Sequence, residues 1–179
     1  MPTKRCYPAA VYAKNALVVA GGHNAGWLAT IEILNTVNRQ WSSVSSLPVN
    51  MYYPSATICG DYVYIHPRTN DQEKNSVYKC SLEQLVQSQS GSAIWENITS
   101  LPVSWSSLTT VNGHLLAVGG VKANDRTNNI YQYINTSWTV VGHMTSPRSA
   151  PTIAILPGNK LMVVGARGAD QQCKIATIT

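Results

Sequence analysis

The stretch that decides the fold is Leu17-Val18-Val19-Ala20-Gly21-Gly22, because similar stretches recur along the chain. Residues 115–120 read Leu-Leu-Ala-Val-Gly-Gly, and residues 161–166 read Leu-Met-Val-Val-Gly-Ala. Residues 62–67, which read Tyr-Val-Tyr-Ile-His-Pro, take the same place in a further copy that lacks the glycines. Each copy follows a turn signal. A short apolar run that ends on small residues predicts a strand followed by a tight turn. Four copies predict a repeat fold.

A tryptophan recurs with the same rhythm. After each of Trp41, Trp95 and Trp138, a β-branched residue stands three positions later and Leu or Met stands six positions later. The successive spacings are 54 and 43 residues. Units of this length built from short strands are typical of β-propellers, where a large apolar ring fills the space between neighbouring sheets. We therefore predict structural roles for the repeated residues, which are Trp41, Trp95, Trp138, Gly21, Gly22, Gly119, Gly120 and Gly165.

Each unit contains four short segments of near-alternating hydrophobicity, which we name strands A, B, C and D in chain order. Strand B is the stretch described first, and the tryptophan belongs to strand D. The predicted repeats are residues 5–47, 51–101, 105–144 and 148–179, the last without a strand D. This alignment places Trp105 at the position that Arg5 takes before strand A, and it places His66 at the second position of the glycine doublet. The predicted fold is all-β, with about three and three-quarter four-stranded antiparallel blades.

These landmarks together resemble the kelch repeat, and the resemblance extends over residues 1–179. It implies a partial β-propeller that begins in the linker before a strand A and ends after a strand C. Kelch propellers close by pairing a strand from one end of the chain into the blade at the other, so we expect the chain to be the C-terminal part of a propeller of about six blades. The alternatives are a tight four-bladed ring and association of chains through open propeller ends.

The second repeat contains an insertion between its strands C and D. Ser81 followed by Gln84 forms a capping-box pattern, and Leu82, Leu85 and Val86 fall on one face of a helix. We predict a short helix over residues 81–87 and a loop over residues 88–92.

The composition argues against several classes of protein. Apolar residues make up 44% of the chain and charged residues 12%, which fits a packed domain rather than a disordered tail. The net charge of +5 is scattered without a Lys/Arg tract, so we expect no nucleic-acid binding. No apolar run is long enough to cross a membrane. The four cysteines (Cys6, Cys59, Cys80 and Cys173) form no metal-type pair, so we expect reduced thiols, no metal, no cofactor and a cytoplasmic location.

The resemblance also implies a binding surface, made by the loops between strands B and C and the linkers between strands D and A. The B–C loops are residues 23–29, 67–74, 121–127 and 167–172, and the D–A linkers are residues 2–7, 48–53, 102–107 and 146–150. The candidate contact residues are Arg5, Met51, Tyr52, Trp105, Arg148, Arg68, Lys122, Arg126, Arg167 and His23. Arginine binds carboxylates through paired hydrogen bonds, so we expect a protein partner with an acidic segment. The alternative for Arg5 and Arg148 is that they only hold the linkers through backbone carbonyls.

We expect a non-catalytic protein-binding scaffold, with two alternatives left open. A propeller enzyme of the oxidase or isomerase type would need an acid–base pair or metal ligands that converge on the channel. The four histidines fall at different positions of the repeat, and Asp71, Asp125 and Asp170 lie in B–C loops whose composition also suits turns. A carbohydrate-binding module is the other alternative, because Trp, Tyr and Asn side chains can stack on sugars and hydrogen-bond to them.

Overall fold

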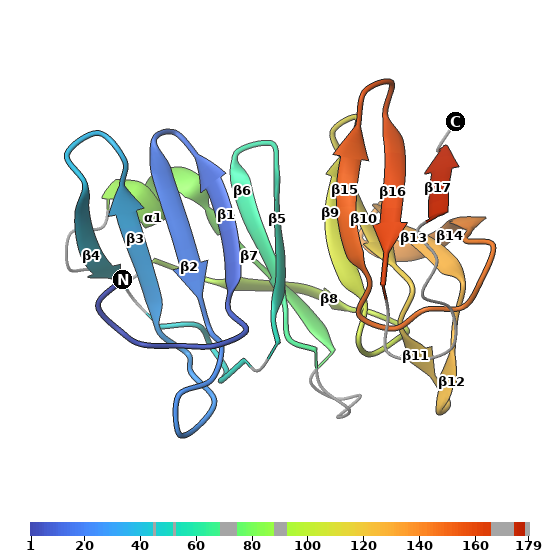
Figure 1. Ribbon diagram of the computed structural model, residues 1–179, viewed down its shortest axis with the longest axis horizontal. Helices are drawn as coiled ribbons and strands as arrows, with labels where there is room; N and C mark the ends of the chain where they lie inside the picture. Colours follow the sequence, from blue (N-terminus) through green and yellow to red (C-terminus); the bar gives the residue numbers. More distant parts are fainter. Residues whose placement is uncertain (45, 52, 69–74, 88–92, 166–173, 178–179) are drawn as a thin grey trace. The chain divides into compact units, whose positions relative to one another are not determined.

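A computed structural model describes residues 1–44, 46–51, 53–68, 75–87, 93–165 and 174–177 (Figure 1). The chain divides into two compact units, the first of residues 1–67 and 77–98 and the second of residues 68–76 and 99–179. Short antiparallel strands form nearly all the regular structure, and the described residues contain one short helix. The all-β class predicted from the sequence is confirmed.

The first two sheets each contain four antiparallel strands. The first comprises β1 (Ala9–Ala13), β2 (Ala16–Ala20), β3 (Ile31–Asn35) and β4 (Gln40–Val44). The second comprises β5 (Ser55–Cys59), β6 (Tyr62–His66), β7 (Ser76–Ser81) and β8 (Glu96–Ser100). The strands lie side by side in chain order in both sheets, as expected for a four-stranded propeller blade.

The third sheet repeats this arrangement with β9 (Ser107–Val111), β10 (His114–Val118), β13 (Asn129–Ile134) and β14 (Ser137–His143). A small hairpin of β11 (Val121–Lys122) and β12 (Asp125–Arg126) occupies its B–C loop, and we did not predict it because two-residue strands leave no periodicity in the sequence. The last sheet is three-stranded, with β15 (Thr152–Leu156), β16 (Lys160–Val164) and β17 (Lys174–Thr177).

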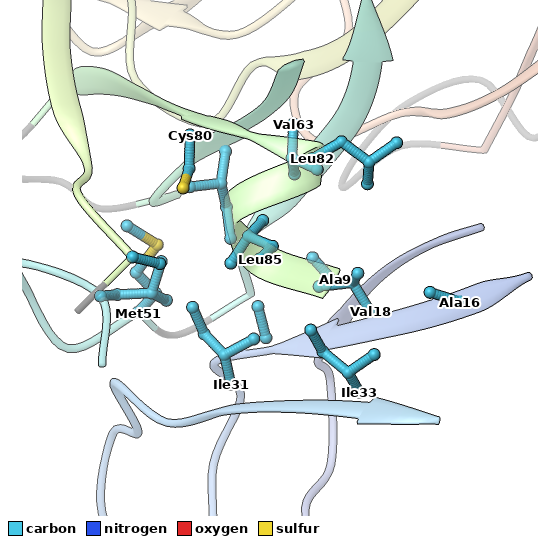
Figure 2. Close-up of a cluster of buried hydrophobic side chains, with 14 residues drawn as sticks. Ala9, Ala16, Val18, Ile31, Ile33, Met51, Val63, Cys80, Leu82 and Leu85 are labelled. Carbon is cyan, nitrogen blue, oxygen red and sulfur yellow. The ribbon is translucent and has the colours of Figure 1, made fainter. Parts of the chain in front are cut away.

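The predicted helix is present as α1 (Leu82–Gln87) and belongs to the core of the first unit. Its first turn is capped as expected, because the Gln84 backbone N–H donates to the Ser81 hydroxyl at 3.5 Å. Leu82 and Leu85 are buried against residues of the first sheet such as Val18 and Ile33, and Figure 2 shows the helix beside the strands that carry them. The helix is therefore a fixed part of the first unit.

The second unit has its own apolar core. Its buried members come from the third and fourth sheets and from the linker between them, and they are Val111, Leu116, Val118, Ile130, Met144, Leu161 and Val163.

The structure corrects the sequence alignment in the third repeat. Ser104 exchanges two backbone hydrogen bonds with Val121, as Cys6 does with His23, so Val103 rather than Trp105 is the counterpart of Arg5. The start of each strand A agrees, because Ala9, Ser55, Ser107 and Thr152 all lie four residues after Arg5, Met51, Val103 and Arg148 respectively. The sequence alignment was wrong here because the third repeat has Ser106 where the others have Pro8, Pro54 and Pro151, and it lacks the arginine of the first and fourth repeats.

The second repeat needs a similar correction. Ser55 pairs with His66 where Ala9 pairs with Ala20 in the first sheet. Pro67 and Arg68 therefore take the places of Gly21 and Gly22, and His66 is a buried strand residue rather than the second member of the doublet. The sequence placed it wrongly because no glycine marks the end of this strand.

Candidate functional site

Arg5, predicted as a contact residue, is enclosed by its own repeat. Its Nη1 donates to the carbonyls of Gly21 at 2.7 Å and Thr30 at 3.0 Å, and its Nη2 donates to the Thr30 hydroxyl at 3.0 Å. Nη2 also lies 3.3 Å from Oε2 of Glu32, and the exposed fractions of the two side chains are 0% and 2%. These contacts hold the linker against the end of β2, as the backbone-carbonyl alternative predicted.

Arg148 makes the matching contact in the fourth repeat. Its Nη1 donates to the Gly165 carbonyl at 2.8 Å, and the residue is buried. Its own carbonyl accepts from the Gly120 backbone N–H at 2.7 Å, which joins the third repeat to the linker that follows it. Arg148 therefore positions the linker from inside.

The second and third repeats carry apolar residues at the position that Arg5 and Arg148 take in the first and fourth. Met51 is 0% exposed and packs in the first core, where its carbonyl accepts from the Gly22 N–H at 2.8 Å. Val103 is buried in the third repeat, and Tyr131, whose place in the sheet matches that of Glu32, is buried as well. The ion pair of the first repeat thus has an uncharged counterpart in the third.

Two residues after these positions, the backbone turns left-handed in every repeat. The φ angles are 54° at Tyr7, 53° at Tyr53, 54° at Trp105 and 48° at Ala150. This conformation is unfavourable for bulky residues and occurs where the surroundings enforce it. In the second unit, the Ala150 N–H donates to the Trp105 carbonyl at 2.7 Å, which ties two successive linkers together.

Trp105 lines a cavity of about 560 Å³ in the second unit, which we call the linker pocket. Its walls come from two D–A linkers and from the β11–β12 hairpin. The hairpin is held at its base by the two hydrogen bonds between Ser104 and Val121, and it turns through Ala123 and Asn124, whose φ values are 49° and 70°. The described lining residues are Trp105, Val121, Asn124, Asp125, Arg126, Pro147 and Ser149.

The predicted cations lie in different environments. Arg126 lines the linker pocket, and both it and Lys122 are exposed on the hairpin. Arg68 is half-buried, and it donates from Nε to the Ser106 carbonyl at 3.1 Å and from Nη2 to the Ser107 hydroxyl at 2.6 Å. Burial lowers the pKa of the Arg68 guanidinium to about 10. Tyr52 and Arg167 fall outside the described residues.

The loops of the first unit expose aromatic rings. His23 is partly buried and pairs through its backbone with both Cys6 and Trp27, while the Trp27 side chain is 50% exposed. The rings of Tyr7 and Tyr53 lie 4.3 Å apart between centroids, and a hydrogen bond between the two side chains raises the pKa of Tyr7. Sequence reasoning did not single out Tyr7, Tyr53 or Trp27. The left-handed backbone at Tyr7 and Tyr53 and the exposure of the Trp27 ring are set by the folded structure and leave no local pattern.

Metal ligation and membrane insertion would each need features of another kind. The described residues contain no group of three or more His, Cys, Asp or Glu residues placed to hold a metal ion. No helix among them has the length and apolar character needed to cross a membrane.

Comparisons with known proteins agree with the repeat architecture. The kelch motif matches residues 4–48. The kelch repeat and BTB domain-containing protein 3 of Mus musculus is 39% identical over an alignment of 70 residues, and the match covers 36% of this chain and 12% of that protein. The proteins of the same name from Pongo abelii and Homo sapiens are each 36% identical over 70 residues, covering 36% of this chain and 11% of those proteins. The motif match over residues 4–48 and the repeated four-stranded sheets agree with the resemblance of the chain to kelch repeats.

Proposed function

We propose that the chain is a non-catalytic scaffold that binds a protein partner through its D–A linkers and B–C loops. Kelch repeats and the kelch-and-BTB relatives support a role in protein interaction at this general level. The observation that carries the finer proposal is the linker pocket, where Trp105 and Arg126 lie together. Tryptophan and arginine are the residue types most enriched among those that dominate binding energy at protein interfaces.

The lining of the pocket indicates the kind of segment that it would take. Trp105, Val121 and Pro147 offer apolar surface for one partner side chain. Arg126 offers a fork of donors for a carboxylate, and the exposed Lys122 gives the hairpin a second cation against the single carboxylate of Asp125. We therefore propose a partner segment in which an apolar residue stands next to Asp or Glu.

Arg5 and Arg148 have a positioning role in this proposal. Their guanidinium groups are buried against backbone carbonyls, so they fix the linkers on which the contact residues stand. A cytoplasmic site of action fits the described cysteines, Cys6, Cys59 and Cys80, which are thiols and not disulfides.

Selection of a random displayed-peptide library on the purified chain tests the proposal. We expect enriched peptides to pair an apolar residue with Asp or Glu, and we expect the Trp105→Ala variant not to bind them. The Arg126→Glu variant should instead select peptides in which a basic residue replaces Asp or Glu. Thr139→Ala, an exposed change on β14 outside the pocket lining, is the matched control. Peptides that bind the Trp105→Ala and Arg126→Glu variants as well as the native chain would place the contact surface elsewhere.

A further inference from the structure

A second cavity lies in the first unit, at the end of the first sheet that carries the β1–β2 and β3–β4 turns. It measures about 350 Å³ and is lined at the β1–β2 turn by Lys14 and Asn15 and at the β3–β4 turn by Asn35 and Asn38. Because the turns β1–β2 and β3–β4 leave the sheet at the end opposite to the β2–β3 loop, this cavity is separate from the surface proposed above. We call it the amide pocket.

The insertion in the second repeat helps to build this pocket. Val86 of α1 forms part of its lining, together with Ala16, Ile33 and Trp41 of the first sheet. Leu82 and Leu85 anchor the helix in the core, so Val86 is held in place. Within the described residues, α1 is the only helix, so no other described repeat has this wall.

The polar side of the pocket carries four primary amides, those of Asn15, Asn35, Asn38 and Gln40. The Asn35 Oδ1 accepts from the Val37 N–H at 2.9 Å and from the Asn38 N–H at 3.3 Å, and the Asn38 Oδ1 accepts from the Gln40 N–H at 3.0 Å. The turn therefore uses the oxygens of two amides and fixes how these side chains point. Among the described residues, neither of their Nδ2 groups donates a hydrogen bond to the protein.

The backbone around these amides is also fixed. The Asn15 carbonyl accepts from the Thr36 N–H at 2.8 Å and from the Thr36 hydroxyl at 3.0 Å, which joins the two turns. A site whose donors are held before the ligand arrives loses less conformational entropy on binding.

The charge at the rim favours a neutral ligand. Lys14 is the only charged residue among the described lining, and its Nζ lies 3.5 Å from Oδ1 of Asp61. An anion would have to compete with this carboxylate for the ammonium group. Amides, by contrast, donate to and accept from neutral hydroxyl groups equally well.

From this geometry we propose that the amide pocket binds one neutral sugar ring. The apolar face of the ring would lie on Trp41 and Val86, and its hydroxyls would meet the amides of Asn38 and Gln40. A cavity of about 350 Å³ with one apolar wall and a few fixed polar groups has the size and character of a small-molecule site.

Saturation-transfer difference NMR on the 179-residue chain tests the proposal, with the methyl glycosides of glucose, galactose, mannose and N-acetylglucosamine as probes. We expect at least one of the four to bind saturably with a Kd of about 1 mM or lower. The informative variants are Asn38→Asp and Gln40→Glu, because each keeps the side-chain oxygens and removes the NH₂ donors. Either change is expected to weaken binding about tenfold, as is Trp41→Ala.

Trp27→Ala is the matched control, because it removes an exposed tryptophan at the opposite end of the same sheet and is expected to leave sugar affinity unchanged. The proposal is overturned if none of the four glycosides saturates, if Asn38→Asp and Gln40→Glu bind like the native chain, or if Trp27→Ala abolishes binding. Peptide selection on Asn38→Asp is expected to match the native chain, so failure of this proposal is distinguishable from failure of the scaffold proposal.

Discussion

Replacing Arg5 by alanine is expected to destabilise the first unit strongly. The change removes three hydrogen bonds, to the Gly21 carbonyl, the Thr30 carbonyl and the Thr30 hydroxyl. It also removes the cation that lies 3.3 Å from the Glu32 carboxylate, which is 2% exposed. From the described part of the chain, Glu32 then keeps only its hydrogen bonds from the Thr3 N–H at 2.9 Å and the Thr3 hydroxyl at 2.5 Å.

The magnitude follows from the burial of this pair. Removing one partner of a buried ion pair costs about 3 to 5 kcal/mol, because the other charge stays buried without compensation. With a urea dependence of about 2 kcal/mol per M, the unfolding midpoint of the first unit should fall by about 2 M. Urea unfolding followed by tryptophan fluorescence measures this shift, since Trp27 and Trp41 both lie in the first repeat.

The third repeat supplies the matched control. It carries buried Val103 and Tyr131 at the places of Arg5 and Glu32, so the double change Arg5→Val with Glu32→Tyr copies an arrangement that the chain already uses. We expect this double variant to lie within about 1 kcal/mol of the native chain, well above Arg5→Ala alone. An Arg5→Ala midpoint equal to the native one, or a double variant less stable than Arg5→Ala, would refute the reasoning.

Three further outcomes are expected. Gly120→Ala should lower the free energy of unfolding in urea by about 2 kcal/mol, because φ is 124° at this residue and a Cβ would stand 2.6 Å from the Ser104 carbonyl oxygen. The control Gly26→Ala places its Cβ where no atom lies within 4 Å, so its free energy of unfolding should stay within about 0.5 kcal/mol of the native value. Equal losses in the two variants would contradict this reasoning. Ala150→Gly should raise the stability of the second unit by about 1 kcal/mol, because its φ of 48° suits glycine, and a lowered melting temperature would count against it. In alkylation by iodoacetamide at about pH 8.5, exposed Cys6 should react long before Cys80, whose pKa burial raises to about 11; peptide mass spectrometry that finds Cys80 modified first would reject the assignment.

The amino-acid sequence predicted the elements that depend on local patterns. The strand β2 and its counterparts were visible as apolar runs between turn signals, since alternation and turn chemistry act over a few residues. The helix α1 was visible for the same reason, because Ser81 caps it and its leucines repeat at helical spacing. The repeat length followed from the recurrence of these local patterns.

The kelch resemblance, rather than a local pattern, implied the candidate surface, and it did not give the roles of the residues there. It chose the linkers and B–C loops, and Trp105 and Arg126 do line one pocket. It could not show that Arg5 is enclosed, because the partners of its guanidinium group lie at Gly21 and Thr30 and come close only when the sheet forms. Nor could it find Tyr7 or Tyr53, whose left-handed backbone is enforced by the folded surroundings.

The sequence by itself therefore determined the repeated unit, its four strands and the inserted helix, because short-range periodicity and capping specify them. Only the tertiary structure decided the exact alignment of the linkers, with Val103 at the place of Arg5 and Arg68 at the place of Gly22. Those positions are set by backbone hydrogen bonds between separate segments of the chain, such as Ser104 with Val121. Because almost any residue can make a backbone hydrogen bond, these contacts leave no pattern of residue types in the sequence.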